Sequence, residues 1–385
     1  MRSHHRAAAV IAGLVGLGLS VIAASAQVQP NPGFGGGGGG RGGGGGRGGQ
    51  PIVLDPAQIA ALKPLYVAPK LAPAPADNPT TPEKIALGRK LFFDPGLSAN
   101  GRLACASCHD ARRAFTDGQA LSLGVKGEPL ARHTPTVINL AWSQAFFWDG
   151  RADSLEQQAV MPIAEASEMG MPHEVMLTRL RTNAEYTRMI QRAFPGEPAS
   201  VATVGKAIAA FERTLVYADA PFDRWIAGDE DAISDSAKRG FVAFNTRAGC
   251  AQCHSGWNLS DGKFHDIGVP SEDVGVFGVK ADEAFRHFFK TPGLRNIAER
   301  APYMHTGQVG TLNAVLRHYN RGFIRRSSLS PEMANVRARG GGDIIAFLQT
   351  LSSPTAPDLV RLQEALDRQT RPAAPPSLQV ADSRR

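Results

Sequence analysis

Residues 105–109 read CASCH and residues 250–254 read CAQCH, and these two stretches decide how the rest of the chain is interpreted. Two thiols at this spacing can add to the vinyl groups of one haem, and the histidine that follows can then ligate the iron. Together the two stretches use all four cysteines of the chain. The sequence therefore predicts two covalently bound haem c groups, one held by Cys105, Cys108 and His109 and the other by Cys250, Cys253 and His254.

Other uses of paired cysteines explain the pattern less well. A disulfide needs no histidine after each pair, and a zinc site does not require two histidines at the same offset. Haem attachment through thioethers takes place outside the bacterial cytoplasm, and the N-terminus agrees with export. Arg2 and Arg6 precede an apolar stretch, and residues 24–26 (ASA) form a small-x-small cleavage site. We expect residues 1–26 to be a cleavable signal peptide and the mature protein to be periplasmic; a retained membrane anchor is the alternative.

The length and composition set the domain organisation. With 385 residues, 43% of them hydrophobic, the chain is long enough for two ordinary domains. We expect a Gly/Pro-rich disordered linker at 27–78, an N-terminal peroxidatic haem domain at 79–225, a C-terminal electron-transfer haem domain at 226–353 and a tail at 354–385. The net charge of +7 includes no Lys/Arg run, so no nucleic-acid partner is expected. No stretch after the signal peptide is apolar enough for stable membrane insertion.

Apolar residues at helical spacing predict an all-α fold, with two c-type cytochrome domains and long loops around the haems. Thr81-Pro82 can start one helix, Ser200 can cap a second and Asp343 a third. Strand-like alternation is scarce.

Several stretches occur in an order and at spacings that resemble the bacterial di-haem cytochrome c peroxidase / MauG family. They are LGRKLFFDPGLSANGRLACASCH, AFTDG, HTPTVINLAW, FFWDGRADSLEQQAVMPIAEASEMG, KTPGLRNIAERAPYMHTG and TLNAVLRHYNRG. The resemblance covers about residues 81–353. It implies a two-domain, mostly helical fold with the haems on either side of the domain interface. It also implies that the N-terminal haem reacts with peroxide and the C-terminal haem passes electrons.

The resemblance assigns three catalytic residues. Glu168 matches the family's distal glutamate, a carboxylate that can move a proton between the two peroxide oxygens. Gln158 matches a glutamine of the same pocket, with Gln157 as the nearest alternative in the count. Trp148 matches the tryptophan between the haems, where an indole can shorten electron transfer. Arg151 is a candidate partner for a haem propionate.

Val125 stands where many members of the family carry a distal histidine that ligates the first haem. Valine has no donor atom. We therefore expect the first haem to rest five-coordinate on His109 alone, with His133 as the nearest alternative ligand.

Tyr319 stands where the peroxidases supply a methionine to the second haem. Its spacing from Leu312, Val315 and Leu316 forms a helical stripe, so the ring should face inward. A phenolate is a hard anionic donor that stabilises high iron oxidation states. We expect Tyr319 to ligate the second iron, with Met304 and His318 as alternatives.

The family also holds a calcium ion near the haems, through an asparagine side chain and two backbone carbonyls. The matching carbonyls here belong to Arg300 and Pro302, and His133 replaces the asparagine. Because calcium prefers oxygen donors, one calcium ion is an open expectation. His305 matches a family histidine near the haems, and we assign it a supporting role.

The resemblance favours a periplasmic di-haem c-type peroxidase that reduces hydrogen peroxide to water with electrons from a small c-type cytochrome or cupredoxin. One alternative is a MauG-like enzyme that oxidises tryptophan residues of a partner protein through a high-valent iron state. Val125 and Tyr319 favour that alternative, whereas Ala248 disfavours it because MauG has a surface-proximal tryptophan there. The other alternative is a non-catalytic electron-transfer cytochrome, and Glu168 argues against it.

Overall fold

The computed structural model describes residues 54–338 and 340–371, which form a mostly helical fold. The expected helical fold class is confirmed. Within these residues the strands are limited to one antiparallel pair, β1 (Phe264–His265) and β2 (Phe289–Lys290), and a few isolated bridges. None of the helices described here is long and apolar enough to cross a bilayer. The expected signal peptide and most of the expected linker lie outside the described residues.

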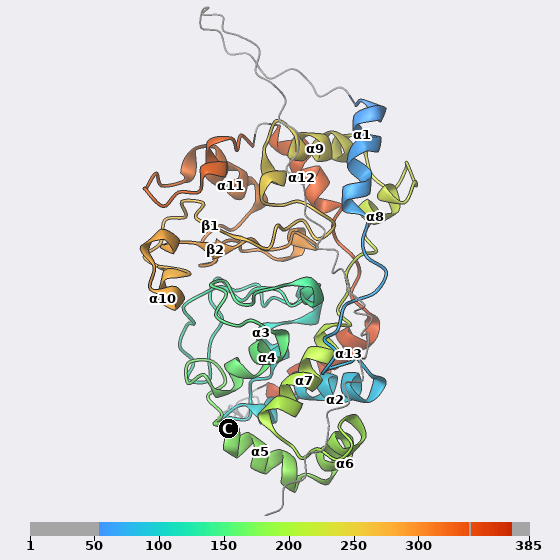
Figure 1. Cartoon of the computed structure of the whole chain (residues 1–385), viewed down its shortest axis with the longest axis vertical. Helices are drawn as coiled ribbons and strands as arrows, with labels where there is room; N and C mark the ends of the chain where they lie inside the picture. The colour runs from blue at the N-terminus through green and yellow to red at the C-terminus, as the bar shows by residue number, and fades with distance from the viewer. Residues whose placement is uncertain (1–53, 339, 372–385) are drawn as a thin grey trace, which may run out of the picture. The chain divides into compact units, whose positions relative to one another are not determined.

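The helices are joined by long loops (Figure 1). In chain order they are α1 (Pro56–Leu62), α2 (Pro82–Phe92), α3 (Cys105–Cys108), α4 (Leu155–Ala164), α5 (His173–Thr182), α6 (Ala184–Ala193), α7 (Val201–Glu212), α8 (Pro221–Ile226), α9 (Asp235–Asn245), α10 (Phe277–Lys280), α11 (Leu312–Arg317), α12 (Gly341–Gln349) and α13 (Pro357–Thr370).

Two of the three expected helix starts are confirmed. The Thr81 hydroxyl accepts a hydrogen bond from the Lys84 amide at 3.3 Å, and Pro82 opens α2. The Ser200 hydroxyl accepts one from the Thr203 amide at 3.1 Å and opens α7. In both cases the side chain satisfies an amide that the first turn leaves without a partner.

The expected cap by Asp343 is wrong. Helix α12 begins at Gly341, so Asp343 lies inside its first turn. Its carboxylate instead binds the Ser236 hydroxyl at 2.6 Å and the Arg239 guanidinium at 3.1 Å, and both partners lie on α9. The residue therefore ties two helices together, a role that the local sequence pattern does not indicate.

Two helix pairs repeat the same close backbone contact. Helix α2 packs on α7, and α9 packs on α12. A Cβ on Gly88 would lie 1.9 Å from the carbonyl oxygen of Ala207, and a Cβ on Gly240 would lie 1.9 Å from that of Asp343. Only glycine allows the two backbones to approach so closely. Each pair therefore depends on one glycine at the crossing point.

The loops between the paired helices also repeat. We call residues 82–217 repeat 1 and residues 235–351 repeat 2. After its haem motif, repeat 1 has AFTDG and repeat 2 has NLSDG. Phe115 and Leu259, at the same place in these segments, both have positive φ angles, of 58° and 51°. Non-glycine residues seldom adopt this conformation, so the agreement reflects one loop design used twice.

A second loop pair continues the repeat. HTPTVIN in repeat 1 corresponds to KTPGLRN in repeat 2. Asn139 and Asn296, the last residues of these segments, have φ angles of 57° and 55° and each precedes a short 3-10 turn. This repeat was not predicted from the sequence, although the matched segments are visible there and could have revealed it.

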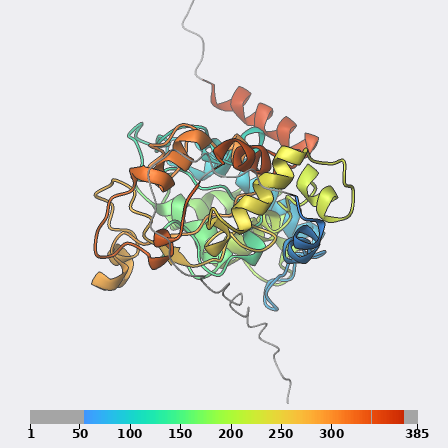
Figure 2. The same ribbon diagram turned by 90° about the horizontal axis from the view of Figure 1, so that it is seen from above.

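Each repeat has its own hydrophobic core, and the chain ends contribute to opposite cores. Tyr66, from the expected linker, packs edge-on between Phe222 and Phe241 in the core of repeat 2. Leu359 and Leu366 of α13, from the expected tail, join the core of repeat 1. Figure 1 shows α1 beside α9 and α13 beside α7, and in the view from above both end helices lie at the periphery (Figure 2). The linker and the tail are thus partly helical rather than wholly extended.

Helix α13 also holds the loop of the first haem motif. The Gln363 side chain, 2% exposed, donates to the Ala106 carbonyl at 3.1 Å and accepts from the Ala111 amide at 3.3 Å. Ala106 lies between Cys105 and Cys108. A residue near the end of the chain therefore fixes the backbone of the first haem attachment site.

Candidate active site

A single large cavity contains both cysteine–histidine motifs. Its volume is about 1380 Å³, well above the ~300–1,000 Å³ of ordinary small-molecule pockets. The haem-attachment residues among its lining are Cys105, Cys108, His109, Cys250, Cys253 and His254. None of the four cysteines forms a disulfide. The thiols are therefore available for thioether bonds.

The two motif histidines are held in the same way. The His109 Nδ1 lies 3.1 Å from the carbonyl oxygen of Phe115, and the His254 Nδ1 lies 3.0 Å from that of Leu259. This contact fixes the tautomer and leaves Nε2 as the ligating nitrogen. Burial lowers the pKa of both imidazoles, which keeps them in the neutral form that binds iron. The cavity, thiols and histidines together fit two haem c groups.

Glu168 and Gln158 line the cavity on the side of the first motif. Burial raises the pKa of the Glu168 carboxyl above its usual value, and Arg151, 3.9 Å away, acts in the opposite direction. The Gln158 Oε1 is buried and has no partner. Gln157, by contrast, is exposed and its Oε1 accepts from the Asp153 amide at 3.0 Å. Of the two glutamines, only Gln158 faces the cavity.

Val125 lies against Glu168, since the Val125 amide donates to the Glu168 carbonyl at 2.7 Å. The Nδ1 of the alternative ligand His133 lies 2.9 Å from the Gln119 carbonyl oxygen, and His133 also lines the cavity. Arg151, a candidate propionate partner, pairs with Asp149 at 3.1 Å and stacks on Phe147. On this side the described lining residues include the carboxyl group of Glu168, whereas Val125 is not among them.

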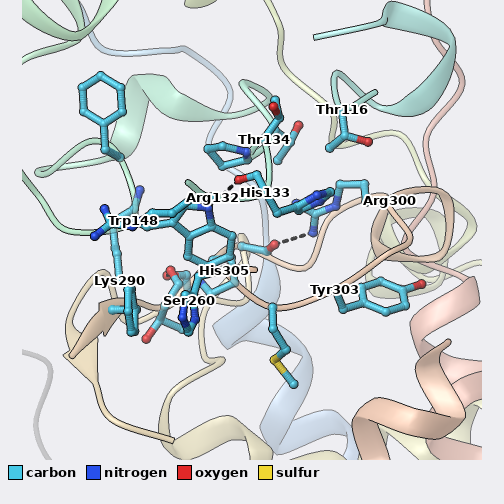
Figure 3. Close-up of a pocket in the computed structure, with 18 of the residues that line it drawn as sticks. Thr116, Arg132, His133, Thr134, Trp148, Ser260, Lys290, Arg300, Tyr303 and His305 are labelled. Carbon is cyan, nitrogen blue, oxygen red and sulfur yellow. Dashed lines mark hydrogen bonds between the residues drawn. The ribbon is translucent and has the colours of Figure 1, made fainter. Parts of the chain in front are cut away.

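Trp148 lies where the two repeats meet (Figure 3). Its indole Nε1 donates to the carbonyl of His133 at 2.8 Å, and the His133 amide donates to the carbonyl of His305 at 2.8 Å. The Lys290 amide donates to the Trp148 carbonyl at 2.8 Å. The His305 ring stacks on Phe289, with centroids 3.7 Å apart. Trp148 is therefore fixed by backbone contacts from both repeats.

Helices α4 and α11 begin alike, after the N-caps Ser154 and Thr311. At the same offset from these caps, repeat 1 has Pro162 and repeat 2 has Tyr319, and both residues line the cavity. A proline side chain has no donor atom, whereas a phenol has one. The corresponding positions therefore give the second site a candidate ligand that the first site lacks at this place.

Tyr319 lies just after α11 in a short π-helical turn, His318–Gly322. Such turns are frequent at functional sites. Burial, reinforced by the nearby thiols of Cys250 and Cys253, raises the pKa of its hydroxyl. The alternative ligand His318 is engaged, because its Nε2 lies 2.9 Å from the Ile267 carbonyl oxygen. Met304 also lines the cavity.

The residues at the family's calcium position do not fit a calcium ion. His133 offers an imidazole that is already bonded to Gln119. Arg300 is 6% exposed, its Nη2 donates to Gly293 at 2.5 Å, and its charge acts on the ring of His133. A buried guanidinium and a nitrogen donor are unsuited to an ion that prefers oxygen ligands. Figure 3 shows Arg300 beside His133.

Two ionisable residues at the cavity were missed by sequence reasoning. Burial raises the pKa of the Glu212 carboxyl to about 8 and lowers the pKa of the Lys290 ammonium to about 8. Both residues lie in segments whose other residues are mainly apolar and are typical of a protein core. A comparison of the two repeats could have drawn attention to Lys290, because Lys290 in KTPGLRN occupies the position of His133 in HTPTVIN.

Comparison with known proteins agrees with this geometry. A family model described as di-haem cytochrome c peroxidase matches residues 82–231. The methylamine utilization protein MauG of Methylorubrum extorquens is 48% identical, covering 77% of this chain and 86% of that protein. The cytochrome c551 peroxidase of Nitrosomonas europaea is 34% identical, covering 73% of this chain and 84% of that protein.

A crystal structure of a MauG-like protein associated with microbial copper homeostasis superposes with a TM-score of 0.70 at 32% identity, covering 76% of this chain and 97% of that one. The diheme peroxidase BthA of Burkholderia thailandensis shares the fold, with a TM-score of 0.62 at 22% identity, covering 73% of this chain and 90% of that one. The chain belongs to the di-haem cytochrome c peroxidase family and is an oxidoreductase with two covalently bound haem c groups.

Proposed function

We propose that the chain reduces hydrogen peroxide to water at the first haem, with electrons from a small c-type cytochrome or cupredoxin. The observation that carries this proposal is the pocket beside Glu168. It contains a carboxyl group of raised pKa and a buried amide oxygen on Gln158 that has no partner among the described residues. The resemblance to the family puts Val125, which has no donor atom, at the position of the distal ligand. An electron carrier has no need of an acid beside an open iron position.

The protein groups supply the proton movements. The bound haem supplies an iron that can exchange oxidising equivalents with peroxide. Glu168 accepts a proton from the peroxide oxygen nearer the haem iron and gives it to the other peroxide oxygen, which leaves as water. Gln158 Oε1 accepts a hydrogen bond from the peroxide and orients it. Two electrons and two protons complete the conversion of one peroxide to two waters.

The second haem has the complementary role in this proposal. Tyr319 closes its iron, and Trp148 lies on the path between the two motifs. We propose that the second site stores an electron or a hole and passes it through Trp148. The proposal also places the mature protein in the periplasm and a boundary between two haem domains near residues 225–226.

A peroxide titration and a turnover assay test the proposal. Stoichiometric peroxide should change the optical spectrum of the as-isolated ferric protein rapidly, and a reduced small cytochrome should then be oxidised over many turnovers. An electron-transfer cytochrome would show neither response. Low-spin signals alone in the ferric EPR spectrum would contradict an open first haem.

A second candidate function is the oxidation of tryptophan residues of a partner protein. Tyr319 at the second site and the 48% identity to MauG favour it. Ala248, which is buried, gives this chain no surface tryptophan just before the second motif. The same assay separates the two functions. A long-lived oxidised state with little turnover of the small cytochrome would favour the protein substrate.

A further inference from the structure

Lys290 is a cation that faces the cavity without a partner. It lines the cavity together with both haem motifs. Burial alone lowers the pKa of its ammonium to about 8, and no carboxylate among the described residues contributes to that shift. The Lys290 side chain is partly exposed, and a haem bound in the cavity would cover it. A covered charge without a counter-charge is costly. The position therefore calls for an anion that is not a side chain of the described residues.

Three acids that line the cavity are already paired. Asp149 and Asp273 both bind Arg132, at 2.5 and 2.6 Å. Asp261 binds His265 at 2.8 Å. None of these three carboxylates is therefore free to offset the ammonium of Lys290.

Lys290 differs in chemistry from the residue at the matching position of repeat 1. In repeat 1 its counterpart is His133, whose amide donates to His305 as the Lys290 amide donates to Trp148. The ring of His133 is neutral at its lowered pKa and is bonded to Gln119. The same backbone contact therefore holds His133, whose ring is neutral and hydrogen-bonded, in repeat 1, and Lys290, whose ammonium has no partner among the described residues, in repeat 2.

The segment around Lys290 borders the second haem. Pro292, two residues further along, has its carbonyl against the ring of His254. Figure 3 shows Lys290 close to Trp148 and Ser260 on the wall of the pocket. Each haem c carries two propionates, which are carboxylates on a flexible arm at the edge of the porphyrin. A propionate of the second haem is the anion that this place receives.

We propose that Lys290 is the counter-cation of a propionate of the second haem, and that as a positioning residue it sets the electrostatic potential between that haem and Trp148. A cation beside the porphyrin favours the reduced iron, which carries one positive charge less. The inference rests on the two haems and not on the substrate, so it stands or falls separately from the proposed peroxidase activity.

Spectroelectrochemical titration of the two-haem protein tests the proposal. In Lys290→Met the reduction equilibrium of the second haem should move about tenfold toward the ferric form, which is ~59 mV for one electron. Lys290→Gln should behave in the same way, Lys290→Arg should restore the wild-type potential, and the first haem should stay unchanged. Lys70→Met, at an exposed position, is the matched control.

The proposal is overturned if both neutral variants keep the wild-type potential, or if Lys290→Arg shifts it as far as Lys290→Met. Where a neutral variant fails to load haem, the haem content per chain decides the question. Loss of one haem in both neutral variants but not in Lys290→Arg supports the need for a cation. Loss in all three variants contradicts it.

Discussion

Repeat 1 and repeat 2 share their scaffold and differ at matched positions that line the cavity. Both have a glycine at the helix crossing, a loop residue of positive φ and a histidine Nδ1 bonded to a loop carbonyl. At matching positions, Pro162 of repeat 1 corresponds to Tyr319 of repeat 2, and His133 of repeat 1 corresponds to Lys290 of repeat 2. The scaffold is common to both repeats, and we expect the side chains at these few positions to determine how the two haem sites differ.

The largest expected effect concerns the acid of repeat 1. Glu168→Gln removes the group that moves the proton, so kcat/KM for peroxide should fall by roughly 10²–10⁴-fold. Stopped-flow reaction with peroxide measures this. The matched control is Glu165→Gln, a carboxylate three residues earlier whose pKa is lowered by hydrogen bonds from Ser167. An equal loss of kcat/KM in both variants would contradict the assignment of Glu168 as the group that moves the proton.

The second prediction exchanges the open and closed sites. Tyr319→Phe removes the donor atom of repeat 2, so the EPR signal of the second haem should change to high spin while the first haem stays as it is. In Pro162→Tyr, the reciprocal change, the first haem should gain a phenolate ligand and lose more than ~10-fold in its rate with peroxide. Unchanged optical and EPR spectra in Tyr319→Phe would eliminate tyrosine ligation.

The third prediction tests whether the shared scaffold is equally strict in both repeats. Gly88→Ala and Gly240→Ala each force a Cβ into a carbonyl oxygen. Each should lower the free energy of unfolding by about 1–3 kcal/mol. Gly342→Ala, with nothing within 4 Å of the added Cβ, is the control and should be neutral or slightly stabilising. Thermal unfolding of the three variants gives the comparison, and tolerance at either crossing would show that the repeats pack differently.

The smallest effect is a shift in a pH profile. Arg151 lowers the pKa of Glu168, so Arg151→Gln should raise that pKa further. Glu168 must be ionised to accept the proton from peroxide, and a higher pKa leaves less of it ionised at a given pH. The acid limb of kcat/KM should therefore move to higher pH, and Arg151→Lys, which keeps the charge, should restore it. A limb that stays in place would show that Glu168 does not control it.

The sequence was sufficient for the parts of the fold that depend on local signals. Thr81 and Ser200 start helices as expected because a hydroxyl before a helix satisfies a free amide. Asp343 resembled such a cap but serves a contact between α9 and α12, which only the tertiary structure can show. The linker was expected to be disordered because it is rich in glycine and proline, and residues 354–385 were expected to form a tail. Tyr66 and Leu359 nevertheless find cores far away in the sequence.

The candidate site followed the same division. The motif residues and the cavity-facing Glu168, Gln158, Trp148 and Tyr319 could be located by their place in sequence motifs. Their roles stay predictions. Lys290 was not singled out, although the repeat puts it at the position of His133. Its character comes from lining the cavity and from the lack of a contributing carboxylate among the described residues. Both are properties of the folded chain.

The contact between Gln363 and the first haem motif has a consequence for the order of assembly. A chain is made and folds from its N-terminus, so the CASCH loop exists long before the helix that holds it. Until residue 363 arrives, the carbonyl of Ala106 and the amide of Ala111 lack this partner. The backbone around Cys105 and Cys108 is therefore held in full only when α13 has packed on it, so the first haem attachment site depends on a segment more than 250 residues further along the chain.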